Sequence, residues 1–425
     1  MGWNSWDAFG FTIDEAQFRA NVSALAQMRR LGWQYAVIDE GWYMRNPLGG
    51  SLAERNYLYD ANGLLLPVEA RFPSAANGAG FKPLADWVHR QGLKFGIHIV
   101  RGIPKQVVND NLPIANSSFH AADAADTTET CPWDDANYGV KDNAAGQAYY
   151  DSMLARYAAW GLDFIKVDCI ADHPYRPTEI RQIAEAIRKT GRRIVLSLSP
   201  GPTSLSLAAD IARYAQMTRI ADDHWDAWSY PGKKVEYSFG LSEEFDRIAA
   251  WNKYARPGFW PDADMLPEGS LTPHPGWGSP RQSGYTQDEQ RSEITLWAIS
   301  RSPLIFGGNL SQLDSFTRSL LTNKEVVSIN QKATESGPAL MPAYDGVPAA
   351  QGQARAWYAR VGGKTYAAIF NLADKPQRID IPWLSFHLTG KYYAAYDVWA
   401  GKYGLKADAL HVDLAPHACV LYRVK

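Results

Sequence analysis

The stretch Lys166-Val167-Asp168-Cys169 ends an apolar run that begins at Phe164, so two charged side chains stand where a predicted buried strand gives way to a loop. A buried carboxylate without a partner is costly, so strands rarely end in charge unless that charge is paired or used. The segment Arg219-Ile220-Ala221-Asp222-Asp223 has the same arrangement. Both stretches therefore predict a polar site at the carboxyl ends of buried strands.

Apolar strand-like runs alternate with amphipathic helical segments from the N-terminus to about residue 325. Continuous apolar runs are typical of parallel strands that are covered on both faces. Because no glycine-rich nucleotide loop follows the first strand, the repeats favour a (β/α)8 TIM barrel over a doubly wound sheet within the α/β class. The expected strands span residues 1–6, 35–39, 95–100, 164–168, 194–198, 216–221, 259–262 and 303–306.

Two helix starts carry a capping-box pattern, one formed by Thr12 with Glu15 and the other by Thr286 with Glu289. Two long segments, residues 46–80 and 102–139, interrupt the alternation and are expected to be irregular loops. In a barrel of this kind, both would lie on the face that holds active sites. We therefore expect them to form walls of a pocket.

After about residue 335, short β-rich runs follow one another, separated by turns such as Gly362-Gly363. With no helix of useful length, this pattern favours a small antiparallel β-sandwich. We expect a catalytic barrel over residues 1–335 and a C-terminal β-sandwich over residues 336–425, divided near Ser336-Gly337-Pro338. The expected strands of the sandwich span residues 356–361, 365–371, 378–381, 392–399, 411–414 and 418–423.

The composition is that of an ordinary globular protein, and its 425 residues exceed the size at which one hydrophobic core stops growing. The net charge of −2 gives no sign of a nucleic-acid partner or an anionic membrane. The chain is rich in Trp and Tyr, with 16 and 22 residues. Their flat apolar faces and polar tips suit sugar rings, although large barrels also use aromatic residues in their cores.

Cys131, Cys169 and Cys419 are too few and too scattered for a disulfide scaffold or a tetrahedral metal site. Cys131 and Cys169 can pair if their loops meet, and the sequence leaves this open. No apolar stretch is long enough to span a membrane. The location of the protein is undetermined, and a periplasmic or secreted one is favoured if a leader was removed before Met1.

Side chains at the carboxyl ends of barrel strands converge on one opening. Any single carboxylate there can be explained by a helix cap or an ion pair, but a converging set favours function. Two carboxylates from separate strands that face one pocket are what a glycosidase uses to break an acetal. The predicted strands bring seven carboxylates together: Asp39, Glu40, Asp168, Asp222, Asp223, Asp262 and Asp264.

Four motifs in order resemble glycoside hydrolase family 27, which includes α-galactosidases, α-N-acetylgalactosaminidases and β-L-arabinopyranosidases. They are Gly2-Trp3-Asn4-Ser5-Trp6, Asp39-Glu40-Gly41-Trp42, Lys166-Val167-Asp168-Cys169 and Asp262-Ala263-Asp264-Met265-Leu266. The resemblance runs from residue 2 to about 310, and the tail matches the family's architecture. It implies a retaining exo-glycosidase that removes terminal α-D-galactosyl residues by double displacement, with no metal or organic cofactor.

The resemblance also implies roles for individual residues. Asp168 would be the nucleophile, and Asp223, four residues after Arg219, would be the acid/base, with Asp222 as the competing choice. Asp264 would lie in the pocket or just behind it, with helix capping as the alternative. The residues implied in sugar binding are Trp6, Asp39, Glu40, Lys166, Arg219 and Met265.

The chain departs from the family pattern at several of these places. Glu40 stands where family α-galactosidases carry Asp. Either its extra methylene crowds C6 of galactose, which β-L-arabinopyranose lacks, or it takes another rotamer and leaves galactose binding intact. A β-L-arabinopyranoside is therefore an alternative substrate. Ser199 is a small residue resembling that of the α-N-acetylgalactosaminidases, a weaker alternative. His98 and Arg101 replace the usual residues after the third strand, and they either shape the pocket and bind the aglycone or form hydrogen bonds within loops.

Two interpretations that do not involve glycoside hydrolysis stay open. Strand-end carboxylates with a Lys are also used by barrel enzymes that hold Mg²⁺ for proton abstraction. A sugar-binding protein without catalysis is the other. In each glycosidase alternative the expected partner is a carbohydrate that ends in galactose or arabinopyranose, and we expect no nucleic acid.

Overall fold

The computed structural model describes residues 1–48, 56–230, 238–271, 281–340, 353–404 and 407–425. The chain divides into two compact units that each combine distant segments. The first unit comprises Met1–Arg219, Ser270–Gln282 and Ile305–Gln312, and the second comprises Ile220–Gly269, Ser283–Leu304 and Leu313–Lys425. None of the helices in the described ranges has both the length and the apolar character needed to cross a membrane.

The first unit is built on a parallel sheet with the strand order β9-β8-β7-β3-β2-β1-β15. The register pairs Lys166 with His98 on one side and with Ser197 on the other, so polar side chains of adjacent strands lie at one level. The strands are β1 (Gly2–Asn4), β2 (Tyr35–Ile38), β3 (Lys94–Val100), β7 (Phe164–Asp168), β8 (Val195–Leu198), β9 (Met217–Arg219) and β15 (Ile305–Phe306). All seven overlap strands predicted from their apolar runs.

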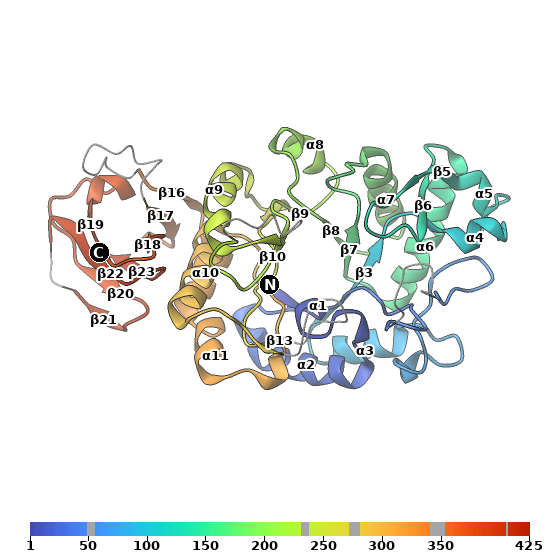
Figure 1. Ribbon diagram of the computed structural model, residues 1–425, viewed down its shortest axis with the longest axis horizontal. Coiled ribbons are helices and arrows are strands. Elements are labelled where there is room, and N and C mark those ends of the chain that lie inside the picture. Colours follow the sequence, from blue (N-terminus) through green and yellow to red (C-terminus); the bar gives the residue numbers. More distant parts are fainter. Residues whose placement is uncertain (49–55, 231–237, 272–280, 341–352, 405–406) are drawn as a thin grey trace. The chain divides into compact units, whose positions relative to one another are not determined.

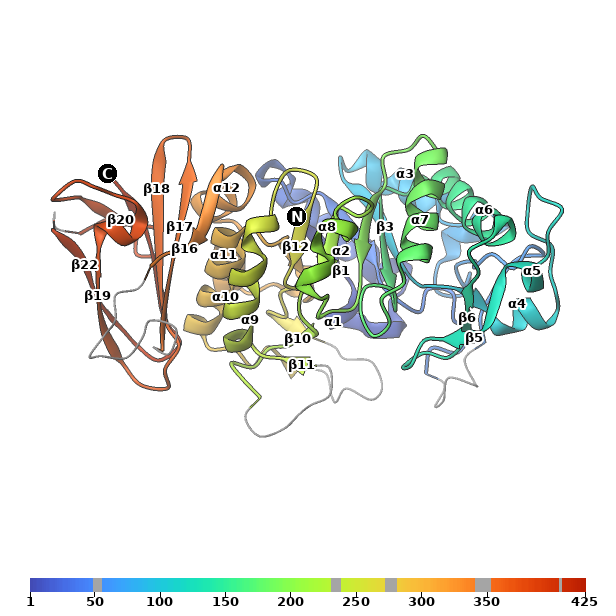
Figure 2. The same ribbon diagram turned by 90° about the horizontal axis from the view of Figure 1, so that it is seen from above.

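Helices alternate with these strands, and α6 and α7 lie side by side next to β7 (Figure 1, Figure 2). The longer helices are α2 (Glu15–Met28), α3 (Lys82–Arg90), α6 (Ala144–Trp160) and α7 (Pro177–Lys189). The shorter ones are α1 (Trp6–Phe9), α4 (Lys105–Asn109), α5 (Ala121–Ala124) and α8 (Ala208–Ile211). Single 3-10 turns are η1 (Gly10–Thr12), η2 (Arg29–Leu31), η4 (Pro73–Ala75), η5 (Leu205–Leu207) and η7 (Leu310–Gln312).

The predicted capping box of Thr12 with Glu15 is wrong. Thr12 ends η1, and its hydroxyl donates a hydrogen bond to the carbonyl of Phe9 at 2.7 Å. The N-cap of α2 is Asp14, whose carboxylate accepts from the backbone N–H of Gln17 at 2.8 Å while the Gln17 side chain accepts from the backbone N–H of Asp14 at 3.1 Å. A capping box is therefore present at the start of α2, but it is formed by Asp14 and Gln17, two residues later than predicted.

The segment 102–139 is more ordered than predicted. In place of an irregular loop it contains α4, α5 and a small antiparallel sheet of β4 (Ile103–Pro104), β5 (Ala125–Thr130) and β6 (Asn137–Val140) in the order β4-β6-β5. Gly102 begins it with φ +92°, where a Cβ would lie 2.1 Å from the carbonyl oxygen of Tyr138, so no larger residue fits this turn. The other long segment, 46–80, is irregular apart from η4 and isolated bridges in its described part, and residues 49–55 lie outside that part.

The second unit contains β12 (Trp260–Asp262), the remaining strand of the barrel series, which comes after β9 and before β15 in the chain. Its helices are α9 (Leu241–Trp251), α10 (Gln287–Ser300), α11 (Ser315–Leu321) and α12 (Lys324–Lys332). The predicted box of Thr286 and Glu289 at the start of α10 is confirmed. Short elements are β10 (Asp223–His224), β11 (Ser238–Phe239) and η6 (Asn252–Tyr254) here, and β13 (Ser270–Leu271) and β14 (Arg281–Gln282) in the first unit.

The C-terminal part of the second unit is an antiparallel β-sandwich (Figure 2). One sheet has the order β16-β17-β18-β23-β20-β21, and β19 pairs with β22 in the other. Ile369 from the first sheet and Ile381 from the second belong to one buried cluster with Trp383 and Phe386. The strands are β16 (Glu335–Pro338), β17 (Ala354–Val361), β18 (Lys364–Asn371), β19 (Gln377–Pro382), β20 (Ala395–Asp397), β21 (Lys402–Tyr403), β22 (Ala409–Leu414) and β23 (Cys419–Val424), with one 3-10 turn, η9 (Trp383–Phe386).

The predicted fold class is confirmed. Eight strands, β1, β2, β3, β7, β8, β9, β12 and β15, follow one another with intervening helices in the manner of a (β/α)8 barrel, and an antiparallel β-sandwich completes the chain. The residues expected to divide the two domains, 336–338, form part of β16, which pairs with β17.

Candidate active site

Asp39, directly after β2, is buried and forms an ion pair with Lys166 of β7, whose side chain is 14% exposed. The Lys166 Nζ lies 3.0 Å from Asp39 Oδ2, and the Asn4 side chain donates to the same oxygen at 2.6 Å. Asp39 Oδ1 accepts from the backbone N–H of Glu40 at 2.8 Å. Burial raises the pKa of Asp39, but Lys166, His98 and these hydrogen bonds more than offset it, so the pKa lies well below its usual value. Asp39 is thus an ionised hydrogen-bond acceptor at neutral pH.

Asp168 ends β7 with a carboxylate that stays partly open, its side chain being 17% exposed. Its Oδ1 accepts from the backbone N–H of Cys169 at 2.7 Å, and its Oδ2 lies 3.6 Å from His98 Nε2. Burial raises the pKa of Asp168, but His98, Lys166 and the Cys169 N–H outweigh it and the net pKa is lowered. An ionised carboxylate with an accessible face is suited to act as a nucleophile.

His98 belongs to this site, a role that the sequence left open. It lies on β3 opposite Lys166 and is 1% exposed, and its carbonyl accepts from the Trp42 indole N–H at 2.8 Å. The strand register therefore brings His98, Lys166 and Asp168 together. In contrast, the guanidinium of Arg101 binds backbone carbonyls and Glu179. Of the two roles that the sequence allowed for Arg101, these contacts match hydrogen bonding within loops.

The other predicted residues of the first unit are also at or near strand ends. Trp6 starts α1 and is half-buried, its backbone N–H donates to Asn4 Oδ1 at 2.8 Å, and its ring meets Phe11 edge-on. Ser199 is buried after β8, where its N–H donates to the Val167 carbonyl at 2.9 Å. Glu40 and Arg219 are buried, the former beside Asp39 and the latter at the end of β9.

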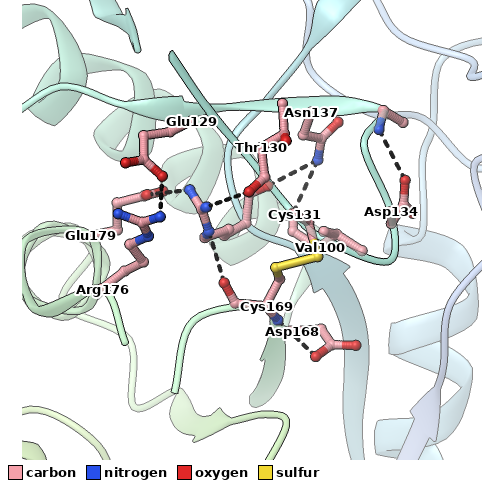
Figure 3. The surroundings of a disulfide bond; sticks show 12 residues. Val100, Glu129, Thr130, Cys131, Asp134, Asn137, Asp168, Cys169, Arg176 and Glu179 are labelled. Atoms are coloured by element: carbon pink, nitrogen blue, oxygen red, sulfur yellow. Dashed lines mark hydrogen bonds and ion pairs between the residues drawn. A yellow bond between two sulfur atoms is a disulfide. The ribbon is translucent and has the colours of Figure 1, made fainter. Parts of the chain in front are cut away.

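A disulfide joins Cys131 to Cys169, the residue after Asp168 (Figure 3). It settles the pairing that the sequence left open, while Cys419 is a buried free thiol. The two half-cystines pack with Val100 in a small buried cluster against Trp133. The bond ties the segment that contains β5 and β6 to the end of the strand that carries Asp168.

In the second unit, hydrogen bonds fix the loop that follows β12. Asp262 Oδ1 accepts from the backbone N–H of Asp264, and Asp264 Oδ2 accepts from the backbone N–H of His224, both at 3.0 Å. Asp264 has φ +85°, and its carbonyl accepts from the Trp297 indole at 3.0 Å. Met265 is buried next to it. Asp264 therefore holds β10 and the β12 loop together within this unit.

Asp223 is the first residue of β10 and Asp222 directly precedes it, and both are half-buried. The predicted pairing of Asp168 with Asp223 joins residues of different units and stays a prediction. The same holds for the sharing of one pocket by all seven carboxylates.

Sequence reasoning missed a buried acidic cluster behind β10. His224 Nε2 lies 2.6 Å from Glu293 Oε1 and 3.1 Å from the Tyr285 hydroxyl, and its Nδ1 lies 3.8 Å from Glu244. Glu244, Glu268 and Glu293 are all fully buried. Burial raises the pKa of Glu268 to about 8, with a further increase from Asp314 and an opposing hydrogen bond with Glu293. The only sequence signal was a His placed directly after Asp223.

No group of three or more His, Cys, Asp and Glu side chains within the described ranges is arranged to hold a metal ion.

Comparison with known proteins places this arrangement in a family. The profile described as "Alpha galactosidase A" matches residues 136–332, and that described as "Alpha galactosidase C-terminal beta sandwich domain" matches residues 351–424. The α-galactosidase A of Cellvibrio japonicus is 28% identical over 443 aligned residues, covering 100% of this chain and 91% of that protein.

Solved structures give closer matches. A family 27 β-L-arabinopyranosidase from Geobacillus stearothermophilus is 38% identical with a TM-score of 0.91, covering 100% of this chain and 95% of that one. A variant of that enzyme was solved in complex with arabinose. A Bacillus halodurans protein, provisionally assigned as an α-N-acetylgalactosaminidase, is 36% identical with a TM-score of 0.84, covering 100% of this chain and 96% of that one.

A barrel with an ionised carboxylate at a strand end and these relatives make the protein a glycoside hydrolase, which acts on carbohydrate. The chain belongs to glycoside hydrolase family 27.

Proposed function

We propose that the protein is a retaining exo-glycosidase that removes terminal sugars of galacto-like configuration, with β-L-arabinopyranosides as the preferred substrates. The observation that carries the proposal is the Asp168 carboxylate, which is ionised beside His98 and Lys166 yet remains partly exposed. From the sequence we expected α-D-galactosides, with β-L-arabinopyranosides as the alternative, and the similarity to the arabinopyranosidase supports that alternative.

The reaction runs in two displacements. Asp168 attacks the anomeric carbon, the bond from that carbon to the leaving-group oxygen breaks, and Asp223 gives its proton to the leaving group. A water then gives a proton to Asp223 and attacks the same carbon, which breaks the ester and restores the Asp168 carboxylate. The His98 contact and the Cys169 N–H keep Asp168 ionised between turnovers.

The ionised pair of Asp39 and Lys166 supports sugar binding near Asp168. A carboxylate and an ammonium offer an acceptor and a donor to neighbouring hydroxyl groups. We assign sugar-binding roles also to Trp6, Glu40, Arg219 and Met265, with Asp264 behind Met265.

Glu40 supports the arabinopyranoside preference. It is buried directly beside Asp39, and it is one methylene longer than the Asp of the family's α-galactosidases. A C6 hydroxymethyl group needs the room that this methylene takes. An α-D-galactoside is the second candidate, supported by the Cellvibrio relative. An α-N-acetylgalactosaminide is the third, supported by the small buried Ser199 and the Bacillus relative.

A direct assay tests the proposal. Initial rates on the nitrophenyl derivatives of β-L-arabinopyranose, α-D-galactose and α-N-acetylgalactosamine should rank in that order of kcat/KM, and NMR should show that the first sugar released keeps its anomeric configuration. Asp168→Ala should lose at least about a thousandfold in kcat. Inversion, or an active Asp168→Ala variant, would refute the mechanism; a galactoside preference would refute the substrate assignment. Activity that disappears on chelation would favour a metal-dependent reaction.

Glu40→Asp tests the substrate argument by removing one methylene. We expect the galactoside to arabinopyranoside ratio of kcat/KM to rise by about tenfold, because one methylene in a pocket is worth 1–3 kcal/mol. Glu40→Gln keeps the length and is the matched control, for which the ratio should stay near that of the native enzyme. An unchanged ratio in Glu40→Asp would rule out crowding at C6.

The acid/base assignment has its own test. Asp223→Ala should slow substrates with poor leaving groups much more than activated aryl glycosides, because only the former need a proton donor. If Asp222→Ala behaves in this way instead, the acid/base lies one residue earlier.

We also propose that the catalytic barrel covers residues 1–335 and the β-sandwich residues 336–425.

A further inference from the structure

The guanidinium of Arg101 makes three hydrogen bonds, one of them to the residue that follows Asp168. Arg101 lies just after β3 and is 2% exposed. Its Nε donates to the Cys169 carbonyl at 2.7 Å, its Nη2 to the Thr130 carbonyl at 3.2 Å, and its Nη1 to Glu179 Oε1 at 2.7 Å. One planar guanidinium therefore joins β3 to three other segments.

Two of these contacts bridge the segments that the disulfide also bridges. The Cys169 carbonyl belongs to one half-cystine, and the Thr130 carbonyl belongs to the residue directly before the other, Cys131. The guanidinium thus forms a second, non-covalent link between the end of β7 and the end of β5.

The link reaches the nucleophile within one residue. The backbone N–H of Arg101 donates to the Asp168 carbonyl at 3.1 Å, and the Cys169 N–H donates to Asp168 Oδ1 at 2.7 Å. Cys169 therefore connects both links to the nucleophile: the guanidinium holds its carbonyl, the disulfide holds its sulfur, and its N–H directs the Asp168 carboxylate. A displacement of about 1 Å at this point is enough to lower a rate about a hundredfold.

Glu179 holds the guanidinium in place. It lies in the first turn of α7, is 3% exposed, and accepts a hydrogen bond from the Tyr150 hydroxyl as well as from Arg101. Lys would keep the positive charge of Arg101 but not the planar, forked set of donors. Its ammonium is a compact point charge that cannot reach three acceptors in one plane.

We propose that Arg101 is a positioning residue for Asp168 that duplicates the Cys131–Cys169 disulfide, so that either link alone keeps the nucleophile in its reactive direction. The inference rests on the proposed role of Asp168. Its functional consequence is that the enzyme keeps most of its activity when the disulfide is absent, in reducing as well as oxidising surroundings.

A double-mutant cycle tests the duplication. Arg101→Met removes the first link, and Cys131→Ala with Cys169→Ala removes the second. We expect each change alone to lower kcat less than about fivefold, and the two together to lower it by about a hundredfold or more with KM little changed. Losses that simply multiply, or a change in KM in place of kcat, would overturn the proposal.

Arg176→Met is the matched control. Arg176 pairs with Glu129 on β5 (Figure 3), and its side chain is 28% exposed, unlike that of Arg101. Its loss should leave kcat unchanged with or without the disulfide. An equal effect of Arg176→Met and Arg101→Met would show that only local charge matters, against the proposal.

Two further measurements separate positioning from folding. Rates are expressed per active site, counted by covalent trapping with a fluorinated glycosyl donor, so a misfolded fraction does not lower kcat. If the combined Met variant does not fold, Arg101→Lys in the chain without the disulfide replaces it, with the same expected loss. An Asp168→Ala variant that stays active would refute the nucleophile itself, whatever the Arg101 cycle gives.

Discussion

At the scale of single residues, the site depends on how charge is balanced at strand ends. Asp39 and Lys166 are held together inside the first unit, and the pair is further fixed by Asn4. A buried pair of this kind adds little net stability, but removing one partner leaves an uncompensated charge and is costly. The pair therefore determines both the shape of the site and its response to acid.

Asp39→Asn should lower the free energy of unfolding by about 3 kcal/mol near neutral pH, because Lys166 then loses its buried counter-charge. The folded-state pKa of Asp39 is lowered, so its stabilisation is present above the unfolded value of about 4 and is lost as the pH falls below that value. The variant should therefore lose less stability on acidification than the native enzyme. Urea unfolding at pH 7 and pH 3 measures both effects.

Asp86→Asn is the control for this prediction. Asp86 also has a lowered pKa beside Lys82, but this pair lies on the surface, where ion pairs contribute little. Its replacement should change stability by less than about 0.5 kcal/mol. A similar loss in both variants would mean that burial of the Asp39 pair does not matter.

At the scale of elements, the pattern of apolar residues predicted strands more reliably than boundaries or loops. The run that ends at Asp168 forms a strand as predicted because only extended backbone lets Ile165 and Val167 pack on one face while Lys166 and Asp168 face the other. The segment 102–139 was predicted as an irregular loop because its β5 is polar and two-residue strands such as β4 leave no periodic signal.

The start of α2 offers a test at this scale. Asp14→Ala should lower the free energy of unfolding by about 1 kcal/mol, since the Gln17 N–H then loses its acceptor. Asp14→Ser keeps a capping oxygen and should cost only a few tenths of that amount. Thermal unfolding of the three proteins gives the comparison, and equal losses for Ala and Ser would show that capping is not the cause.

For the whole molecule, the sequence predicted the fold class and the succession of barrel strands followed by a sandwich, while its assignment of site residues stays a prediction. It could not predict contacts set by three-dimensional packing. Arg101 was a loop residue without an assigned partner, and its acceptors lie 29, 68 and 78 positions away along the chain. The acidic cluster around His224 was invisible for the same reason, because Glu244, Glu268 and Glu293 look like surface residues when read singly.

That cluster should make the stability of the protein depend on pH in the neutral range. Burial raises the pKa of Glu268 to about 8, so between about pH 4.5 and 8 the folded protein keeps a proton that the unfolded chain releases. Stability should therefore fall as the pH rises through this range. Glu268→Gln carries no such proton and should reduce the difference between pH 5 and pH 8 by about 1 kcal/mol or more.

Urea midpoints at the two pH values provide the measurement. Glu243→Gln serves as control because Glu243 is exposed in the first turn of α9 and caps that helix, outside the cluster. If the native enzyme and Glu268→Gln vary equally with pH, Glu268 does not hold the proton.

The pairing of β16 with β17 bears on how the tail can be isolated. Because β16 is the outermost strand of its sheet, it covers backbone N–H and C=O groups of β17 that would otherwise stand open. A fragment that begins after Pro338 would offer this bare edge to another molecule and tend to self-associate. A fragment that begins at Glu335 would keep β16 paired with β17, so the edge of β17 would stay covered.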